Sequence, residues 1–329
     1  MNPLCDRLGI RIPILQAPTG SIAGPELAAA VSEAGALGSM GLTWTNPESA
    51  VKQVRLVREA TSAPFAANFV LSFEPAALIP CLEAGVSIVT FSWGNPTELW
   101  PLVRSFGAKV GIQVGNIEGA KIAAQLSPDF IICQGVEAGG HVQSTRELES
   151  FLADVVSLCG TIPVVAAGGI SDGSDVARSM LARAQGAMLG TRFVATQESR
   201  AHEVYKRRIL DAQSGETALT VCFDGGWSHA PHRTLRNSTL EKWEAAGCPP
   251  HGRRPGEGEA TARMPDGEPI LRYEDTAPRR GMIGAVEEMA MYCGMGADRI
   301  NDLPTAGELV ARLWNEALAS GVRTSDQAS

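Results

Sequence analysis

Short apolar runs of strand length alternate with longer amphipathic stretches of helix length over the first two hundred residues of the chain. The runs are almost continuously apolar, which is typical of parallel strands that are covered on both faces. The stretches between them carry helix start and stop signals, such as Pro25 in a first turn and Gly35 at an end. Eight strand–helix units predict an α/β fold, a (β/α)8 TIM barrel, rather than a doubly wound sheet. The eight runs are Pro13–Pro18, Ala36–Gly41, Phe65–Leu71, Ile88–Trp93, Lys109–Gly115, Phe130–Gly135, Pro163–Gly169 and Gly186–Phe193.

The pattern changes after residue 214. The segment that follows contains Trp227 and Trp243, which suggest that it is folded. From Gly247 to Gly281 it is rich in Pro, Gly, Arg and Glu and has little periodicity. A long irregular segment of this kind is usually functional or disordered. We therefore predict a smaller inserted lobe that packs over the C-terminal mouth of the barrel.

Two further helices are expected near the C-terminus. One runs from about Ile283 to Tyr292, and the other starts after Thr305 and ends near Ser320. The predicted organisation is a TIM barrel of residues 1–214 that carries the cofactor or ligand site, a lid or substrate lobe of residues 215–281, C-terminal helices in residues 282–320 that pack on the barrel, and a disordered tail of residues 321–329.

The composition excludes several classes of protein. The chain has 329 residues, of which 44% are hydrophobic and 19% charged, which argues against disorder. The net charge is -8 and no long run of Lys and Arg occurs, so neither nucleic acid nor an anionic membrane is an expected partner. No stretch approaches the roughly 18 apolar residues of a membrane helix, and the N-terminus lacks a signal pattern. We therefore expect a cytoplasmic protein.

Cysteines and histidines show no metal-binding pattern. The seven cysteines lie far apart without any Cys-x-x-Cys pair, which indicates reduced thiols. His229 and His232 are three residues apart, but no nearby cysteine or carboxylate completes a ligand set. No metal is expected.

Two glycine-rich loops follow predicted strands seven and eight. Strand seven ends in Ala167-Gly168-Gly169, and strand eight ends in Gly190-Thr191. Glycine lets the backbone approach a ligand closely, and backbone N–H groups in such loops bind phosphate. The loops after strands seven and eight are also the usual phosphate site of this fold. They predict a ligand that carries a phosphate.

Other strand ends suit a planar ring. Strand one ends in Ala17-Pro18-Thr19, where small residues and a proline flatten the chain. Strands three and five carry the neutral amides Asn68 and Gln113 within apolar runs. Buried amides need hydrogen-bond partners, and the edge of a heterocycle would supply them. An ordinary turn and structural hydrogen bonds are the alternatives.

The loop after strand six, from Gln134 to His141, contains the first histidine of the chain. A neutral imidazole at the barrel mouth can take a proton from carbon or donate a hydrogen bond to an oxyanion, although a lone histidine is often structural. Glu137 is expected to fix the loop. Strand four ends in Ser92-Trp93, which could line a small substrate pocket or pack in the core.

Together these segments resemble the nitronate monooxygenases, formerly called 2-nitropropane dioxygenases, of the FMN-dependent barrel type. The similarity covers about residues 8–318, and the run that ends in His141 is its most specific part. Thr19 stands where many members carry Met, and the motif Tyr292–Gly296 lacks the Gln that is expected near Met295. The segments that carry the resemblance are Pro13–Pro18, Phe91–Pro96, Gln134–His141, Ala166–Ile170 and Leu189–Phe193.

The resemblance implies bound FMN and the oxidation of alkyl nitronates, or of nitroalkanes, with O2 to a carbonyl compound and nitrite. His141 matches the catalytic histidine of the family and would act as a general base or as a hydrogen-bond donor. Ser92 and Trp93 are candidate walls of the substrate pocket. The implied FMN-binding residues are Ala17, Pro18, Thr19, Asn68, Gln113, Gln134, Gly135, Gly139, Gly140, Ala167, Gly168, Gly169, Gly190 and Thr191.

Three other functions stay open on the same scaffold. The first is an FMN- and NAD(P)H-dependent reductase of enoyl thioesters. The second is a specialised biosynthetic flavin oxidase, for which the segment from Gly247 to Gly281 would remodel the pocket. The third is a flavin-binding barrel without activity, against which His141 argues. IMP dehydrogenases share the phosphate loops but need a cysteine after strand six, where this chain carries His141. A homodimer is also compatible with the sequence.

Overall fold

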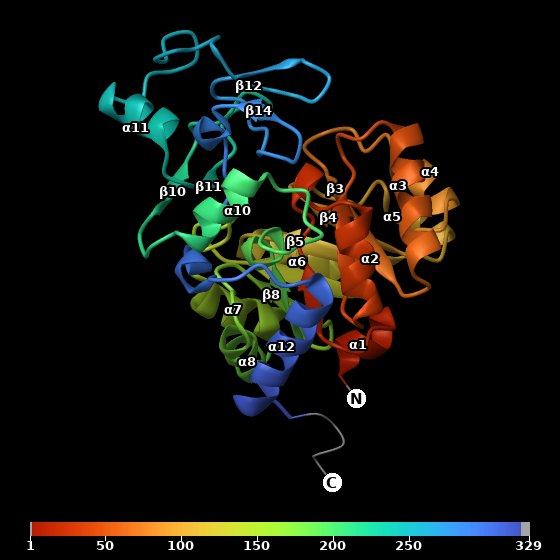
Figure 1. Ribbon diagram of the computed structural model, residues 1–329. Coiled ribbons are helices and arrows are strands. Elements are labelled where there is room, and N and C mark those ends of the chain that lie inside the picture. The colour runs from red at the N-terminus through yellow and green to blue at the C-terminus, as the bar shows by residue number, and fades with distance from the viewer. Residues whose placement is uncertain (1, 324–329) are drawn as a thin grey trace.

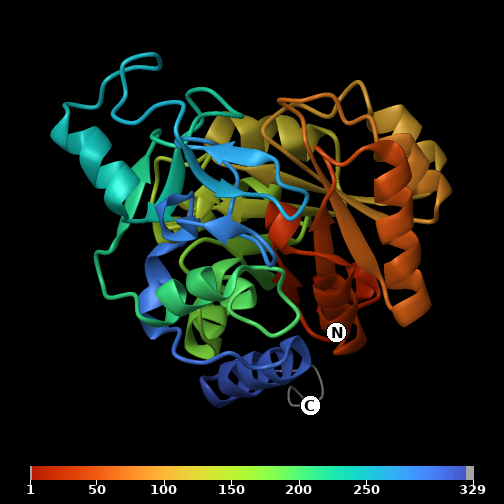
Figure 2. The ribbon, with the colours of Figure 1, turned by 45° about the horizontal axis from the view of Figure 1, so that its top comes forward.

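The computed structural model describes residues 2–323 (Figures 1 and 2), and residues 324–329 of the predicted tail lie outside the described part. Eight parallel strands form one sheet in the order β1-β9-β8-β6-β5-β4-β3-β2. Hydrogen bonds of Leu37 with Ile14 and Gln16 join its two ends. The predicted (β/α)8 barrel and its eight strands are confirmed. The strands are β1 (Ile14–Gln16), β2 (Gly38–Gly41), β3 (Phe65–Val70), β4 (Ile88–Ser92), β5 (Lys109–Val114), β6 (Phe130–Gln134), β8 (Val164–Ala167) and β9 (Gly186–Leu189).

Helices surround the barrel on its outer face (Figure 1). Several begin at side chains that cap free backbone N–H groups, as Asn46 does for Ser49 and Asp172 for Asp175. The barrel helices and turns are α1 (Pro3–Leu8), η1 (Gly20–Ile22), α2 (Pro25–Glu33), α3 (Pro47–Ala60), α4 (Leu78–Glu83), α5 (Trp100–Ser105), α6 (Ile117–Gln125), α7 (Leu148–Cys159), α8 (Gly173–Leu181), α9 (Thr191–Val194) and α10 (Glu203–Leu210).

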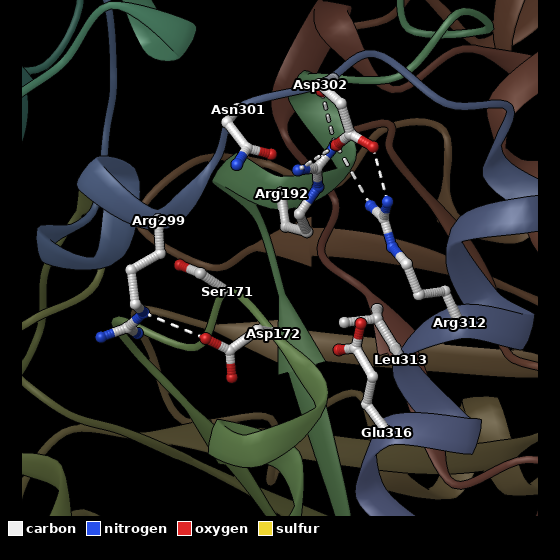
Figure 3. Close-up of a pocket in the computed structure, with 9 residues that line it drawn as sticks. All are labelled: Ser171, Asp172, Arg192, Arg299, Asn301, Asp302, Arg312, Leu313 and Glu316. Carbon is white, nitrogen blue, oxygen red and sulfur yellow. Dashed lines mark hydrogen bonds and ion pairs between the residues drawn. The ribbon is translucent and has the colours of Figure 1, made fainter.

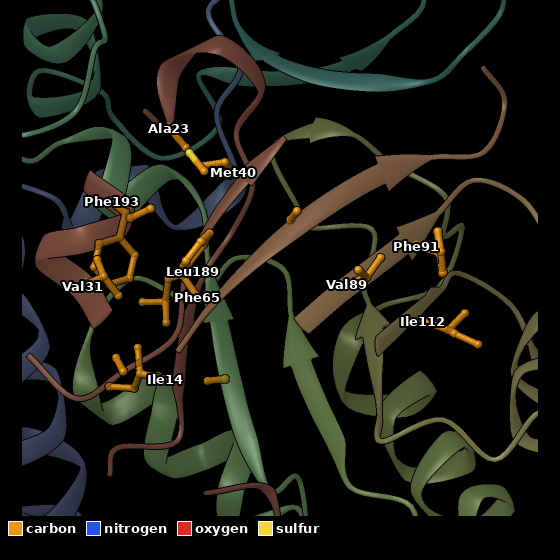
Figure 4. Close-up of a cluster of buried hydrophobic side chains, with 14 of the residues drawn as sticks. Ile14, Ala23, Val31, Met40, Phe65, Val89, Phe91, Ile112, Leu189 and Phe193 are labelled. Atoms are coloured by element: carbon orange, nitrogen blue, oxygen red, sulfur yellow. The ribbon is translucent and has the colours of Figure 1, made fainter. Parts of the chain in front are cut away.

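The hydrophobic core has two layers, because each strand is apolar on both faces. One layer, between the sheet and the helices, contains Val31, Phe91 and Leu189 (Figure 4). The other fills the barrel interior, where strand residues meet Leu4 and Leu8 of α1. Each fully buried side chain of this size contributes roughly 1.5–3 kcal/mol. Because α1 closes the N-terminal end of the barrel, the C-terminal end is left for a site.

The lobe lies over this C-terminal end and contains two small antiparallel sheets (Figures 1 and 2). Their orders are β10-β11-β7 and β13-β12-β14. Strand β7 belongs to the barrel loop after β6, so its pairing with β11 joins the lobe to the barrel. The elements are β7 (Gly140–His141), β10 (Thr217–Thr220), β11 (His232–Leu235), α11 (Ser238–Ala245), β12 (Ala260–Arg263), β13 (Pro269–Leu271), β14 (Ile283–Gly284), η2 (Val286–Glu288) and η3 (Met295–Arg299).

The helix predicted from Ile283 to Tyr292 is wrong. Ile283 and Gly284 form β14, which pairs with β12, and Gly284 has a φ of 115°, which a helix does not allow. Residues 291–293 run beside β11 and bond to it through Met291 and Cys293. The run predicted as strand eight also ends earlier than expected, at Leu189, because α9 begins at Thr191.

The second C-terminal helix is confirmed as α12 (Ala306–Ala319), which packs against α8 and α2. Thr305 and Glu308 form a capping box at its start. Within residues 2–323, every helix is too short or too polar to cross a membrane.

Candidate active site

The predicted glycine loops meet at the C-terminal end of the barrel. A Cβ at Gly190 would lie 3.7 Å from the Cβ of Ala17, so the loops after β9 and β1 adjoin. Gly168 and Gly169 have φ values of 125° and 67°, which strongly favour glycine. A Cβ at Gly169 would lie 3.0 Å from the Cβ of Glu137, so the loops after β8 and β6 also pack closely.

Three of the predicted glycines are explained by the chain around them, two by close neighbours and one by its φ. A Cβ at Gly139 would lie 2.5 Å from the backbone nitrogen of Gly294, and one at Gly135 would lie 2.5 Å from the Cβ of Leu148. Gly140 has a φ of 75° at the start of β7. These glycines are therefore explained by chain packing and backbone conformation alone.

Backbone donors gather where a phosphate is predicted. Among residues 2–323, the N–H groups of Gly169, Ile170 and Thr191 have no hydrogen-bond partner. The Thr191 hydroxyl accepts a hydrogen bond of 2.9 Å from Gly294 N–H, and the Cys293 thiol is a second hydrogen-bond partner of the same side chain. Backbone N–H groups without partners in neighbouring loops are suited to an anion.

The buried Arg192 and its half-exposed ion-pair partners support these loops on the side away from the mouth. Arg192, which is 2% exposed, pairs with Asp302 at 3.0 Å and donates to the carbonyl oxygens of Ala195 and Asp302. Arg312 bonds the same carboxylate. A polar cavity of about 140 Å³ lies beside this group (Figure 3), between Arg192 and the pair of Arg299 with Asp172. The loop after β9 is thus anchored to the chain just before α12.

The predicted amides differ in what they contact. The Asn68 NH2 group donates to the carbonyl and the hydroxyl of Thr90, at 3.2 and 3.1 Å, which leaves its carbonyl oxygen for a ligand. Gln113 donates to the Gln143 side chain at 2.7 Å. Gln134 instead donates to the carbonyl of His141 at 3.2 Å and accepts from Gln143 N–H at 2.8 Å. Its observed role is to hold the segment that carries the histidine.

Glu137 fixes the same loop, as expected. Its carboxylate accepts the N–H of Leu148 at 2.9 Å and so caps the start of α7. Arg233 of β11 donates to the carbonyl of Val136 at 2.9 Å. The loop after β6 is therefore held from both the barrel and the lobe.

His141 lies on β7 among aromatic rings. Trp227 of the lobe stacks on it, with ring centroids 4.4 Å apart and planes inclined by 28°. Tyr292 and His232 lie 5.5 Å away, and Trp93 lies 6.3 Å away. The Nε2 atom of His141 is enclosed and has no hydrogen-bond partner among residues 2–323. Burial, and to a lesser degree His232, lowers its pKa to about 3, so the ring is neutral at ordinary pH.

His232 has a structural role beside it. Its Nδ1 donates to the carbonyl of Ala230 at 2.9 Å, and its Nε2 accepts from Phe223 N–H at 3.2 Å, which fixes one neutral tautomer. Burial lowers the pKa of His232 as well. Among residues 2–323, no group of three or more His, Cys, Asp or Glu is arranged to hold a metal ion.

An aromatic wall continues from His141 around the mouth. Trp227 contacts Trp93, Phe73 and Trp44, with centroids 4.7, 5.2 and 6.2 Å apart. Ser92, also predicted for this pocket, is buried at the end of β4. Trp44 and Phe73 were not among the predicted site residues, although both follow strand ends, where the fold places its site. Gln143, Tyr292 and the pair of Arg192 with Asp302 were not predicted either.

The family model of nitronate monooxygenase matches residues 1–80 and 76–316. The chain belongs to the nitronate monooxygenase family. The nitronate monooxygenase of Pseudomonas aeruginosa is 29% identical to it, over 94% of this chain and 97% of that protein. A (3aS,4S,5R,7aS)-5-hydroxy-7a-methyl-1-oxo-octahydro-1H-indene-4-carboxyl-CoA dehydrogenase of Mycobacterium tuberculosis is 33% identical, over 74% of this chain and 68% of that protein.

Two solved structures share the fold of this chain. FabK from Thermotoga maritima has a TM-score of 0.83 and 28% identity, with 97% of each chain covered. A nitroalkane oxidase from Streptomyces ansochromogenes has a TM-score of 0.79 and 28% identity, with 97% of this chain and 98% of that chain covered. The predicted family is confirmed, and the protein is an oxidoreductase whose family indicates a flavin cofactor.

Proposed function

We propose that this protein oxidises alkyl nitronates with FMN and O2, giving a carbonyl compound and nitrite. The observation that carries the proposal is the enclosed Nε2 of His141, which has no partner at the mouth of the barrel. A buried polar atom without a partner is costly in a native protein and calls for a ligand. The two negatively charged oxygen atoms of a nitronate are hydrogen-bond acceptors that a protonated Nε2 could bond.

The residues present fit FMN. The partnerless N–H groups of Gly169, Ile170 and Thr191, with the Thr191 hydroxyl, would hold the phosphate. The glycines at 168 and 190 leave room for the rest of the cofactor, whose ring would lie along residues 17–19. Asn68 keeps a free carbonyl oxygen for its polar edge. When bound, the flavin would accept electrons from the substrate and pass them to O2.

The environment of His141 favours one of its two predicted roles. Lowering the pKa from 6.5 to about 3 makes proton transfer to the ring less favourable by about 5 kcal/mol, at 1.36 kcal/mol per unit. A base this weak is poorly matched to a neutral nitroalkane, since a good catalytic base has a pKa near the working pH. We therefore assign His141 the donor role, with its N–H toward a nitronate that is already ionised. The aromatic wall excludes water from this hydrogen bond and strengthens it.

The test compares ionised nitronates with their neutral nitroalkanes in the wild type and in His141→Asn. We expect the wild type to prefer the nitronate at least 100-fold in kcat/KM, and His141→Asn to keep its flavin but lose about 100-fold on the nitronate. His229→Asn, which changes an exposed histidine on the lobe, is the matched control. Turnover of the neutral nitroalkane at the rate of its nitronate would refute the donor role.

A thioester substrate is a second candidate, because the relative that is 33% identical acts on a carboxyl-CoA compound. The two candidates separate in one anaerobic experiment on the holoenzyme. Ethylnitronate, an enoyl-CoA with NADPH, and NADPH alone are added in turn while the oxidised-flavin absorption bands are followed. Bleaching by the nitronate supports the first candidate, whereas bleaching only by NADPH, reversed by the enoyl-CoA, supports a reductase.

A further inference from the structure

Trp227 is the part of the lobe that reaches the candidate active site. It lies between β10 and β11, and its indole contacts Trp44, Phe73 and Trp93 of three barrel loops as well as the ring of His141. These loops follow three successive strands, β2, β3 and β4. A single lobe side chain therefore covers one side of the mouth.

The loop that carries Trp227 is anchored on the lobe. Gly225 N–H donates to the carbonyl of Tyr273 at 2.9 Å, and a Cβ at Gly226 would lie 2.4 Å from an oxygen of Asp275. The N–H of Trp227 itself donates to Asp224 of the same loop at 3.2 Å. The position of the indole is therefore set by the lobe, and its contacts with the barrel are made between rings.

The stacking of Trp227 on His141 limits the space beside the histidine ring. Rings with centroids 4.4 Å apart leave no room for another group between them. Of the rings around His141, the indole of Trp227 is the nearest, at 4.4 Å, with Tyr292 at 5.5 Å and Trp93 at 6.3 Å. Trp227 is therefore the ring that most restricts a substituent of a substrate held at His141, and its indole lies 4.7 Å from that of Trp93.

We propose that Trp227 selects the substrate by size: its indole takes the place that a longer alkyl group would need beside His141. The inference rests on the proposed function, because it concerns the alkyl group of a nitronate. The side chain is a specificity-determining residue and supplies no chemistry to the reaction. A protein pocket discriminates one methylene by roughly 10- to 200-fold, so the effect is large enough to measure.

The experiment compares kcat/KM for ethyl-, butyl- and hexylnitronate in the wild type, Trp227→Phe and Trp227→Ala. We expect the ratio of hexyl- to ethylnitronate to rise at least 10-fold in Trp227→Ala and by less in Trp227→Phe. Trp243→Phe is the matched control, since Trp243 lies in the lobe, bonded to Pro249, and is not part of the aromatic wall. Its ratio should equal that of the wild type.

A second measurement does not depend on turnover. Diethyl pyrocarbonate modifies accessible histidines, and mass spectrometry locates the adducts. His141 should react slowly in the wild type and several-fold faster in Trp227→Ala, whereas the exposed His229 and His251 should react equally in both. Equal rates at His141 would show that Trp227 does not cover it and would overturn the inference.

The outcomes separate the two proposals. If the wild type oxidises nitronates but the chain-length ratio is unchanged in Trp227→Ala, selection by Trp227 is refuted while the proposed function stands. If neither the wild type nor any variant oxidises a nitronate, the proposed function fails and selection among nitronates fails with it. Trp227→Phe keeps a smaller aromatic ring in the wall. If Trp227→Ala does not fold, the ratio of hexyl- to ethylnitronate in Trp227→Phe tests the selection by size.

Discussion

Replacement of His141 by Gln should make the protein less sensitive to acid. In the folded protein burial lowers the pKa of His141 to about 3, whereas the unfolded chain has the ordinary value of 6.5. Between these values the unfolded state binds a proton that the folded state does not. The free energy of unfolding therefore rises with pH between 3 and 6.5. The stability that depends on a neutral His141 is lost as the pH falls from 6.5 toward 3.

The size of the effect follows from the two pKa values. At pH 7.5 the unfolded state is almost unprotonated at this site, so the contribution is about zero. A pH of 5.0 lies 1.5 units below the pKa of 6.5 in the unfolded chain. Protonation of the unfolded state then lowers the free energy of unfolding of the wild type by about 2 kcal/mol, at 1.36 kcal/mol per unit. His141→Gln lacks this titration, so its loss of stability between pH 7.5 and 5.0 should be about 2 kcal/mol smaller. His232 is present in both proteins, and its contribution cancels in the comparison.

Urea unfolding at the two pH values, followed by fluorescence and circular dichroism, measures the difference. Coincident transitions by both probes establish that a single unfolding step is being compared. His229→Gln, at an exposed site, should lose as much stability as the wild type. An NMR titration of the imidazole protons gives the pKa of His141 directly. A midpoint near 6.5, or equal acid losses in the wild type and His141→Gln, would refute the buried neutral imidazole and with it the assignment of the donor role.

Further predictions concern the loops. Gly169→Ala should weaken flavin binding at least 10-fold, measured by flavin fluorescence, because the new Cβ would sit on a backbone with a φ of 67° and 3.0 Å from the Cβ of Glu137. The control is Gly160→Ala, which has a similar φ of 59° but open space around its Cβ and should bind flavin normally. Thr191→Val should raise the flavin Kd about 10-fold through loss of one hydroxyl donor, and an unchanged Kd would exclude this hydroxyl from the phosphate site. Gln134→Leu should lower kcat about 10-fold with flavin retained, because His141 loses its backbone support; loss of flavin instead would make Gln134 a cofactor ligand.

The fold and the positions of the glycine loops at the strand ends could be predicted from the sequence because both depend on local patterns. Continuous apolar runs specify buried parallel strands, and Gly168-Gly169 stands at a strand end whatever the rest of the chain does. The helix expected from Ile283 was wrong because pairing with β12 outweighed a weak local preference. The stacking of Trp227 on His141 could not be predicted, since it depends on how the lobe folds back over the barrel.

The same limit applies to side-chain partners. Gln134 and Gln113 are similar amides near strand ends, and their sequence contexts do not show that one bonds the backbone of His141 while the other bonds a side chain. Only the path of the loop after β6 decides this. Such choices lie in long-range geometry, which a periodic pattern does not specify.

The pairing of β7 with β11 has a consequence for the order of events during synthesis. Roughly ninety residues separate His141 from His232, its partner across these strands. At about 5–20 residues per second, the ribosome releases the second strand roughly 5–20 s after the first. The glycine loops at 168 and 190 emerge within this interval. A nascent chain is therefore expected to have made the loops proposed to hold the cofactor before His141 is fixed by its pairing with β11.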